Sequence, residues 1–161
     1  ISTARTFHNE LNIIDHALFG CLGVGLPYGI AAKLINPERR VLVYTGDGTI
    51  GFNFMEIETS IRKKLPIVIV IDNNQKWGMT SNSMKLKFEH YVPGTVEMGN
   101  PPYHEAVEVL GGKGILVESV DQIQPALEAA FASGMTTCIN VMTDPEVIGP
   151  GTEAFELMKN L

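Results

Sequence analysis

The stretch from Gly46 to Met79 decides the fold, because two polar segments within it each end an apolar run. The first segment is Gly46-Asp47-Gly48-Thr49, and the second is Asp72-Asn73-Asn74-Gln75-Lys76-Trp77-Gly78-Met79. The apolar runs before them, Arg40–Thr45 and Pro66–Ile71, are typical of strands buried in a parallel sheet. We therefore expect two neighbouring parallel strands.

The segment between these strands, Phe52–Lys64, has the length of a helix and completes a strand–helix–strand unit. Its apolar residues Phe54, Ile57 and Ile61 recur at helical spacing and should face the sheet. In a right-handed crossover both strands end at the same edge of the sheet, so the two polar segments should lie side by side. Open α/β sheets bind their ligands at that edge.

The two polar segments contain the groups that magnesium and phosphate require. Magnesium is usually held by one or two protein oxygens together with phosphate oxygens and water. Asp47 offers a carboxylate, and Asn74 offers an amide oxygen. Gly46 and Gly48 let backbone N–H groups approach phosphate closely, and Thr49 adds a hydroxyl near a helix start. The pattern predicts a magnesium–diphosphate site.

The rest of the chain continues the alternation of helices and strands. We expect helices at Leu26–Ile35, Tyr103–Leu110 and Asp121–Ser133, the last capped by Asp121, and strands at Gly114–Val117 and Thr137–Met142. These elements predict an α/β fold with a doubly wound, mainly parallel sheet and helices on both faces. The segment from Met79 to Pro102 lacks periodicity, and we expect a mobile loop that could close over a ligand.

The composition indicates one globular domain over residues 1–161. The chain has 45% apolar and 19% charged residues, which predicts a soluble, folded protein. A net charge of −6 without a basic stripe argues against nucleic acid as a partner. No apolar stretch reaches the roughly 18 residues that span a bilayer, and no leader opens the chain, so we expect a cytoplasmic protein and no membrane partner.

Cysteines and histidines add little to the predicted site. Cys21 and Cys138 lack metal-site spacing, and Cys138 should be buried in its apolar run. None of the histidines has a partner carboxylate at an informative spacing. His90 in the expected loop and His16 upstream are open between a substrate contact and a solvated or packing role. Trp77 is likewise open between a pocket wall and simple packing.

The whole pattern resembles a known family. From Gly46-Asp47-Gly48, through Glu56-Ile57-Glu58-Thr59 and Leu65-Pro66, to Asn73-Asn74, it is similar to the C-terminal diphosphate-binding module of thiamine-diphosphate enzymes of the acetolactate-synthase-like group. The resemblance implies thiamine diphosphate and Mg²⁺ as cofactors. It also implies three magnesium ligands: Asp47, Asn74 and the main-chain carbonyl of Lys76.

A glycine-rich segment upstream extends this resemblance. Gly20-Cys21-Leu22-Gly23-Val24-Gly25-Leu26-Pro27 is similar to the segment that passes beneath the cofactor in acetolactate synthase. The resemblance makes Leu22 the apolar wedge that holds the cofactor bent, and the Gly20 carbonyl the acceptor for its aminopyrimidine amine. The cofactor contacts that it implies are Gly20, Cys21, Leu22, Gly46, Asp47, Gly48, Thr49, Asn74, Lys76, Trp77, Gly78 and Met79.

The resemblance leaves the substrate open between two groups of relatives. The Asn73-Asn74-Gln75 and Gly78-Met79 segments match acetolactate synthase, which would make the enzyme a decarboxylase or carboligase of 2-keto acids. Acetolactate synthases carry a Gln-Trp pair just beyond Gly-Met, whereas this chain has Asn82-Ser83. The segment Gly51–Thr59 instead resembles oxalyl-CoA decarboxylases and 2-hydroxyacyl-CoA lyases, which implies an acyl-CoA-type substrate.

The resemblance also implies a missing partner. In the family, a glutamate that activates the cofactor comes from a separate pyrimidine-binding domain, usually on a neighbouring subunit, so no catalytic residue is assigned in this chain. We expect a homo-oligomer and a chain that is part of a longer protein. One subunit of a split 2-oxoacid decarboxylase or dehydrogenase, and a non-catalytic assembly module, are the alternatives.

Overall fold

The computed structural model describes residues 13–14 and 20–147. At its centre lies a four-stranded parallel sheet in the order β1-β2-β4-β3. The strands are β1 (Leu42–Gly46), β2 (Val68–Asn73), β3 (Lys113–Val117) and β4 (Thr137–Met142). All four strands expected from the sequence are confirmed. Both β1 and β2 begin two residues later than expected, and they end one and two residues later, respectively.

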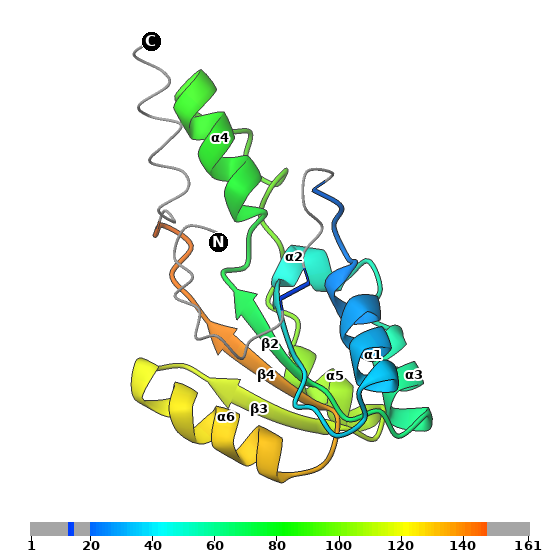
Figure 1. Cartoon of the computed structure of the whole chain (residues 1–161). Helices are drawn as coiled ribbons and strands as arrows, with labels where there is room; N and C mark the ends of the chain where they lie inside the picture. Colours follow the sequence, from blue (N-terminus) through cyan, green and yellow to red (C-terminus); the bar gives the residue numbers. More distant parts are fainter. Residues whose placement is uncertain (1–12, 15–19, 148–161) are drawn as a thin grey trace.

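Helices cover both faces of the sheet (Figure 1), which confirms the doubly wound α/β fold. One face carries α1 (Gly25–Ile35), α3 (Glu56–Arg62) and α5 (Tyr103–Val109), and the other carries α6 (Ile123–Ala132). Each face has its own apolar core, because successive side chains of a strand point to opposite faces. In β2, Ile69 and Ile71 belong to the core under α1, α3 and α5, whereas Val68 belongs to the core under α6.

The helix of the central unit is shorter than expected. The short helix α2 (Asp47–Ile50) follows β1 directly, and a turn separates it from α3, which begins at Glu56 rather than at Phe52. The expected inward face of α3 is confirmed, since Ile57 is fully buried and Phe54 and Ile61 pack against the same core. The turn exists because the chain must leave the sheet edge before it can pack back onto the sheet.

The prediction of a mobile loop between Met79 and Pro102 was wrong for its first part. Gly78–Phe88 form the regular helix α4, which extends beyond the carboxyl ends of the strands (Figure 1). Within α4 only Ser81 is buried, so its sequence needs no apolar face and shows no periodicity. The segment after the helix has no regular structure, but Val96 within it is buried.

The predicted cap of the last helix was also wrong. Asp121 lies inside a 3-10 turn, Val120–Gln122, that precedes α6. The capping residue is Ser119, which forms a capping box with Gln122, so Asp121 is left on the exposed surface. Among the described residues, no helix is long and apolar enough to cross a membrane.

Candidate functional site

The two polar segments meet at the carboxyl edge of the sheet, as the crossover predicts. Gly46 at the end of β1 is in register with Asp72 of β2, so the residues that follow each strand begin from adjacent positions. Asp47 starts α2 and is only 3% exposed. Its Oδ1 atom accepts a hydrogen bond from the Gly48 N–H at 2.8 Å.

The other carboxylate oxygen of Asp47 lacks a partner in the part of the chain that the structure describes. Among the described residues, Asp47 Oδ2 is the buried side-chain oxygen or nitrogen that lacks a hydrogen bond. Burial raises the pKa of this carboxyl group, and the Gly48 N–H that donates to Oδ1 opposes that rise. A buried carboxylate without a counter-charge is costly, which makes this oxygen a candidate ligand for a cation.

The segment after β2 presents neutral oxygens beside this carboxylate. The Asn74 Oδ1 atom accepts from the Lys76 N–H at 3.0 Å and keeps a second lone pair free. Lys76 forms an isolated antiparallel bridge with Glu97. The hydrogen bonds of this bridge run through the residues on either side of Lys76, so the bridge leaves the Lys76 carbonyl unused.

The side chain of Lys76 points into an ion-pair cluster instead. Its ammonium group pairs with Glu146, which also pairs with Lys85 at 3.0 Å. These two cations lower the pKa of Glu146 to about 2. At the sheet edge Lys76 therefore contributes its backbone oxygen, while Glu146, which follows β4, neutralises its side-chain charge.

Two glycines at the edge leave room for neighbouring side chains to lie close to the backbone. A Cβ atom on Gly48 would lie 2.9 Å from the Trp77 ring, and one on Gly78 would lie 2.6 Å from Asn74 Nδ2. The Trp77 ring also meets Phe52 edge-on, with 6.2 Å between ring centroids. Trp77 thus packs across Gly48 and joins the two polar segments.

The remaining predicted cofactor residues lie around the same edge with unequal exposure. Thr49 is half-buried in α2, whereas Met79 is 78% exposed at the start of α4. Gly20, Cys21 and Leu22 are exposed in the glycine-rich segment. This segment is tied to the edge because Asn53 Nδ2 donates to the Gly23 carbonyl at 3.0 Å.

Several residues of the edge were missed by the sequence analysis. Tyr103 belongs to α5, and its hydroxyl donates to the Asp47 carbonyl at 3.2 Å. Asp72 accepts from Tyr44 at 2.8 Å and from Thr143 at 2.6 Å. Asn140, which is buried in β4, accepts from Asn73 at 3.1 Å. A polar residue within an apolar strand, as at Asn140, is a signal that could have been used.

The histidines are placed as follows. His90 is exposed just beyond α4, and His16 lies outside the described residues. His104 on α5 lies with its Nδ1 atom 3.4 Å from Asn140 Nδ2 and its Nε2 atom 3.9 Å from Glu105. His104 therefore approaches the edge through Asn140, a contact that its spacing in the sequence does not indicate.

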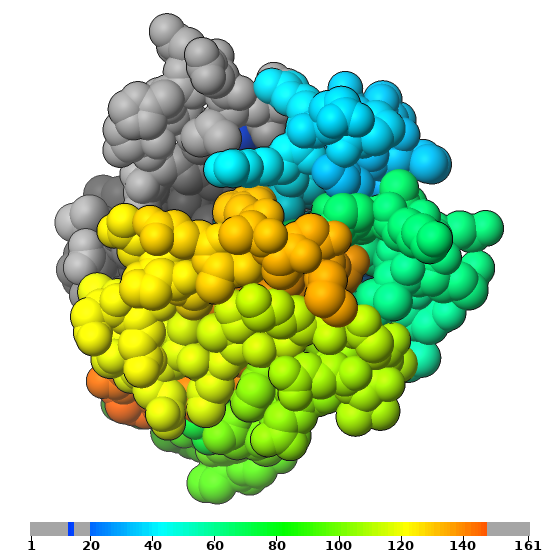
Figure 2. Space-filling model, turned by 90° about the horizontal axis from the view of Figure 1, so that it is seen from below, coloured from blue at the N-terminus to red at the C-terminus, as the bar shows by residue number. Residues whose placement is uncertain are grey.

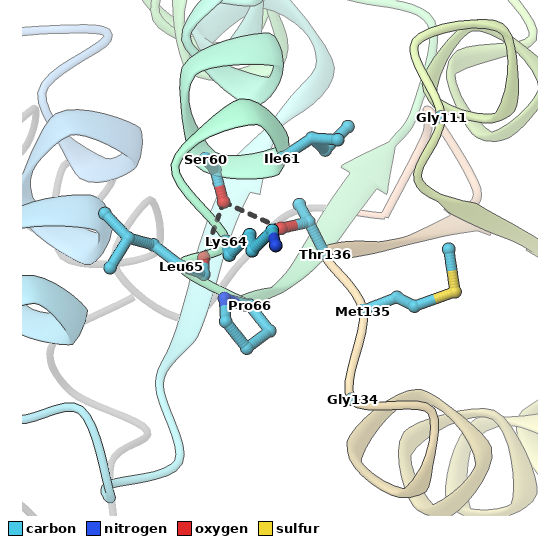
Figure 3. Close-up of a pocket in the computed structure, with 9 residues that line it drawn as sticks. All are labelled: Ser60, Ile61, Lys64, Leu65, Pro66, Gly111, Gly134, Met135 and Thr136. Carbon is cyan, nitrogen blue, oxygen red and sulfur yellow. Dashed lines mark hydrogen bonds between the residues drawn. The ribbon is translucent and has the colours of Figure 1, made fainter.

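The opposite end of the sheet also has a cavity, of about 350 Å³, lined by residues such as Ser60, Lys64 and Thr136 (Figure 3). Figure 2 shows this end, where the turn after α6 lies beside the end of α3. The Ser60 hydroxyl donates to the Leu65 carbonyl and shares a hydrogen bond with Thr136, both at 2.7 Å. The buried polar groups here are satisfied, so this cavity offers no comparable ligand chemistry.

The donor set at the carboxyl edge fits magnesium with a phosphate ligand. It combines one carboxylate, an amide oxygen of Asn74 and the main-chain carbonyl of Lys76, which the bridge to Glu97 does not use; all three are hard oxygen donors. Within the described residues, no group of three or more His, Cys, Asp or Glu side chains could hold a metal by itself. A cation bound here would need further oxygens, which a diphosphate and water can supply.

Comparisons with known proteins identify the family of this chain. A family model described as the C-terminal TPP-binding domain of thiamine pyrophosphate enzymes matches residues 1–141. The acetolactate synthase large subunit of Mycobacterium tuberculosis is 43% identical over 137 residues, which cover 85% of this chain and 25% of that protein. The 2-hydroxyacyl-CoA lyase of Arabidopsis thaliana is 38% identical over 138 residues, which cover 82% of this chain and 24% of that protein.

A solved structure shares the fold. The thiamine diphosphate-dependent 4-hydroxybenzoylformate decarboxylase of Rhodococcus jostii RHA1 superposes with a TM-score of 0.71 at 28% identity, covering 76% of this chain and 23% of that one. The chain thus spans about a quarter of the length of these relatives. Because the family match extends over residues 1–141 and the fold is shared with a solved relative, this chain belongs to the thiamine pyrophosphate enzymes and carries their C-terminal TPP-binding domain.

Proposed function

We propose that this chain supplies the magnesium- and diphosphate-binding half of the active site in a thiamine-diphosphate-dependent decarboxylase or carboligase of 2-keto acids. The observation that carries this proposal is the buried Asp47 carboxylate, whose Oδ2 atom has no partner among the described residues. A purely structural carboxylate at this depth would be paired, because an unpaired buried charge destabilises the fold.

In this proposal, each loop holds a different part of the cofactor. Asp47, Asn74 and the Lys76 carbonyl hold Mg²⁺, which in turn binds the diphosphate. The diphosphate also lies against the backbone of Gly48 and Gly78. Thr49 and Met79 contribute from the first turns of α2 and α4.

The thiamine group is held by the glycine-rich segment. Leu22 packs against the cofactor, and the Gly20 carbonyl accepts from it; both residues are exposed in this chain and available for such contacts. When bound, thiamine diphosphate supplies the carbanion chemistry that breaks or forms a carbon–carbon bond next to a carbonyl group. The protein side of this site binds and orients the cofactor.

The complete active site needs a second domain in this proposal. Relatives are about four times longer than this chain, and the activating glutamate would come from a pyrimidine-binding domain of the same or another chain. A homo-oligomer would bring two such domains together. The unpaired charge of Asp47 argues against a non-catalytic assembly module, because scaffolding does not require it.

The second candidate is a 2-hydroxyacyl-CoA lyase or oxalyl-CoA decarboxylase. Two observations favour it. The chain is 38% identical to the plant 2-hydroxyacyl-CoA lyase, and it has Asn82-Ser83 at the position of the Gln-Trp pair of acetolactate synthases. Asn82 and Ser83 lie in α4, the helix that begins at Gly78. In this candidate function they contribute to the choice of substrate. A full-length enzyme assayed with pyruvate and with a 2-hydroxyacyl-CoA would separate the two candidates.

The first experiment is a calorimetric titration of the chain with thiamine diphosphate, with and without Mg²⁺. Asp47→Asn is the test variant, and Asp72→Asn is its matched control, because it removes the same charge from the same edge while Asp72 already has two hydrogen-bond donors. Asn74→Ala tests the second ligand.

We expect magnesium-dependent binding in the wild type and in Asp72→Asn. Asp47→Asn should lose more than about 100-fold in affinity, beyond the 10–100-fold typical of residues that only support a ligand. Binding that does not depend on Mg²⁺, or equal affinities of Asp47→Asn and Asp72→Asn, would contradict the proposal.

A further inference from the structure

A series of buried side-chain amides connects β4 to the loop after β2. Asn73 is 0% exposed and Asn140 is 1% exposed. The Asn73 Nδ2 atom donates to Asn140 Oδ1 at 3.1 Å and to Asn100 Oδ1 at 3.3 Å. The Asn73 Oδ1 atom accepts from the Gln75 N–H at 3.2 Å. The amide of Asn73 therefore links a strand of the sheet to the backbone of the loop.

The donors and acceptors give this series one direction. Asn73 Nδ2 faces two oxygens, so a flipped Asn73 amide would set oxygen against oxygen and lose the bond to Gln75. Asn140 Nδ2 faces His104 Nδ1 at 3.4 Å, so the His104 tautomer whose Nδ1 accepts supports this orientation and leaves the Asn140 oxygen to face Asn73. In that tautomer His104 supports Asn140, and Asn140 orients Asn73. The His104 contact is the longest of these and should matter least.

The residue at the end of the series has an unusual backbone conformation. Gln75 has a φ of 59°, in the left-handed region that residues other than glycine seldom adopt. Such a conformation persists only where the surroundings hold it. Gln75 lies between Asn74 and Lys76, so its backbone decides how the Asn74 side chain and the Lys76 carbonyl are directed relative to each other.

We propose that Asn140 is a positioning residue for the metal site: it orients Asn73, which holds Gln75 and so sets the relative placement of the Asn74 and Lys76 oxygens. This inference rests on the proposed function, because it concerns how the same oxygens are held. Asn140 lies in β4 and does not belong to either polar segment. Asn100 gives Asn73 a second acceptor, so loss of Asn140 should misplace the loop only in part.

The test uses the difference between two metal ions. Mg²⁺ demands near-ideal octahedral geometry, whereas Ca²⁺ accepts flexible coordination, so a misplaced loop should weaken Mg²⁺ more than Ca²⁺. Mg²⁺ or Ca²⁺ is titrated into the chain at saturating thiamine diphosphate, and both dissociation constants are measured by calorimetry. The test variant is Asn140→Leu, which keeps the branching at Cγ and removes both polar atoms.

The matched control is Thr137→Val, which replaces another buried polar side chain of β4 at the opposite end of the strand. We expect Asn140→Leu to weaken Mg²⁺ binding about tenfold and Ca²⁺ binding clearly less. Thr137→Val should leave both constants unchanged, even if its melting temperature falls. His104→Leu should also weaken Mg²⁺ binding relative to Ca²⁺ binding, but by less. The double variant of His104→Leu and Asn140→Leu should lose no more Mg²⁺ affinity than Asn140→Leu alone.

The outcomes separate the two proposals. A wild-type chain without magnesium-dependent binding rejects the proposed function, and the role of Asn140 with it. Normal wild-type binding with an unchanged Mg²⁺/Ca²⁺ ratio in Asn140→Leu rejects the positioning role alone, as does an equal loss in Thr137→Val. Should Asn140→Leu fail to fold, an unchanged ratio in the half-buried His104→Leu variant would overturn the proposed series.

Discussion

The two ends of the parallel sheet contain similar polar groups but treat them differently. At the amino end, Ser60 and Thr136 are buried beside a cavity of about 350 Å³; their hydroxyls share a hydrogen bond, and Ser60 also bonds to the Leu65 carbonyl. At the carboxyl end, Asp47 is equally buried, yet one of its oxygens has no partner among the described residues. The buried hydroxyls beside the cavity are hydrogen-bonded, whereas the Asp47 Oδ2 atom at the other end has no partner among the described residues.

This difference separates structure from function better than cavity size does. A buried polar group that is hydrogen-bonded stabilises the fold. A buried polar group without a partner destabilises it, and a ligand that binds this group removes the penalty. The parallel arrangement explains the asymmetry, because every strand of such a sheet directs its carboxyl end to the same edge. Variants at the amino end should therefore change stability, and variants at the carboxyl end should change binding.

The largest effect is expected for a pair of glycine variants. Gly112→Ala at the amino end would place a Cβ atom 2.8 Å from the Thr136 carbonyl oxygen, a backbone atom that cannot move aside. We expect the free energy of unfolding to fall by about 3 kcal/mol, as in overpacked cores, measured by urea denaturation. Magnesium-dependent binding should persist under conditions where the variant is folded.

Gly78→Ala is the matched variant at the carboxyl end. Its Cβ atom would meet Asn74 Nδ2, which belongs to a side chain that can turn away. We expect little change in unfolding free energy and a loss of about tenfold or more in affinity for Mg²⁺ and thiamine diphosphate, similar to a displaced supporting residue. If Gly78→Ala had a lower free energy of unfolding than Gly112→Ala, the proposed difference between the two ends would be wrong.

A smaller loss of stability is expected from Ser60→Ala. This change leaves the Leu65 carbonyl and the Thr136 hydroxyl without their partner, which should cost about 1–2 kcal/mol of unfolding free energy. The double variant with Thr136→Val should lose less than the sum of the single variants, because they share one interaction. An effect on cofactor affinity would contradict the separation of the two ends.

Asp47→Asn is expected to raise the stability of the fold in the absence of ligand, in contrast to the variants at the amino end. Burial raises the pKa of Asp47 above its usual value of 3.8, so ionisation costs stability in the folded state. The cost is absent below pH 3.8 and grows as the pH rises through the raised folded pKa. At pH 7 the variant should therefore be more stable by about 1 kcal/mol.

Thermal unfolding at a series of pH values measures this difference. The gain in melting temperature of Asp47→Asn over the wild type should shrink as the pH falls towards 3.8. Saturating Mg²⁺ and thiamine diphosphate should reverse the order at pH 7, because only the wild type gains stability from binding. A variant less stable than the wild type throughout would show that the carboxylate has a structural role.

The smallest effect concerns the two cysteines. Cys138 is fully buried in β4, and burial raises its pKa to about 12, so its thiol stays protonated at pH 8. Cys21 is exposed in the glycine-rich segment. A thiol reagent at pH 8 should label Cys21 rapidly and Cys138 only on unfolding, with no change in stability. The rapid phase should be absent from Cys21→Ser, and its persistence there would show that β4 opens.

Most of the fold was predictable because burial leaves a pattern in the sequence. The four strands and the helices α1, α3, α5 and α6 contact an apolar core, and their apolar residues recur at the spacing of strands or helices. Helix α4 was missed because it buries only Ser81 and therefore shows no such pattern. The cap at Ser119 was missed because a 3-10 turn separates it from α6.

The sequence by itself determined the family, the parallel sheet and the two segments that carry Asp47 and Asn74, because motif spacing and hydrophobic pattern are local properties of the chain. Only the tertiary structure decided which polar groups are satisfied. The unpaired oxygen of Asp47, the contact of Tyr103 with the Asp47 carbonyl and the link from Asn140 to Asn73 each depend on residues distant in sequence. Hydrogen-bond satisfaction is a property of the packed fold, so no local pattern of residues can report it.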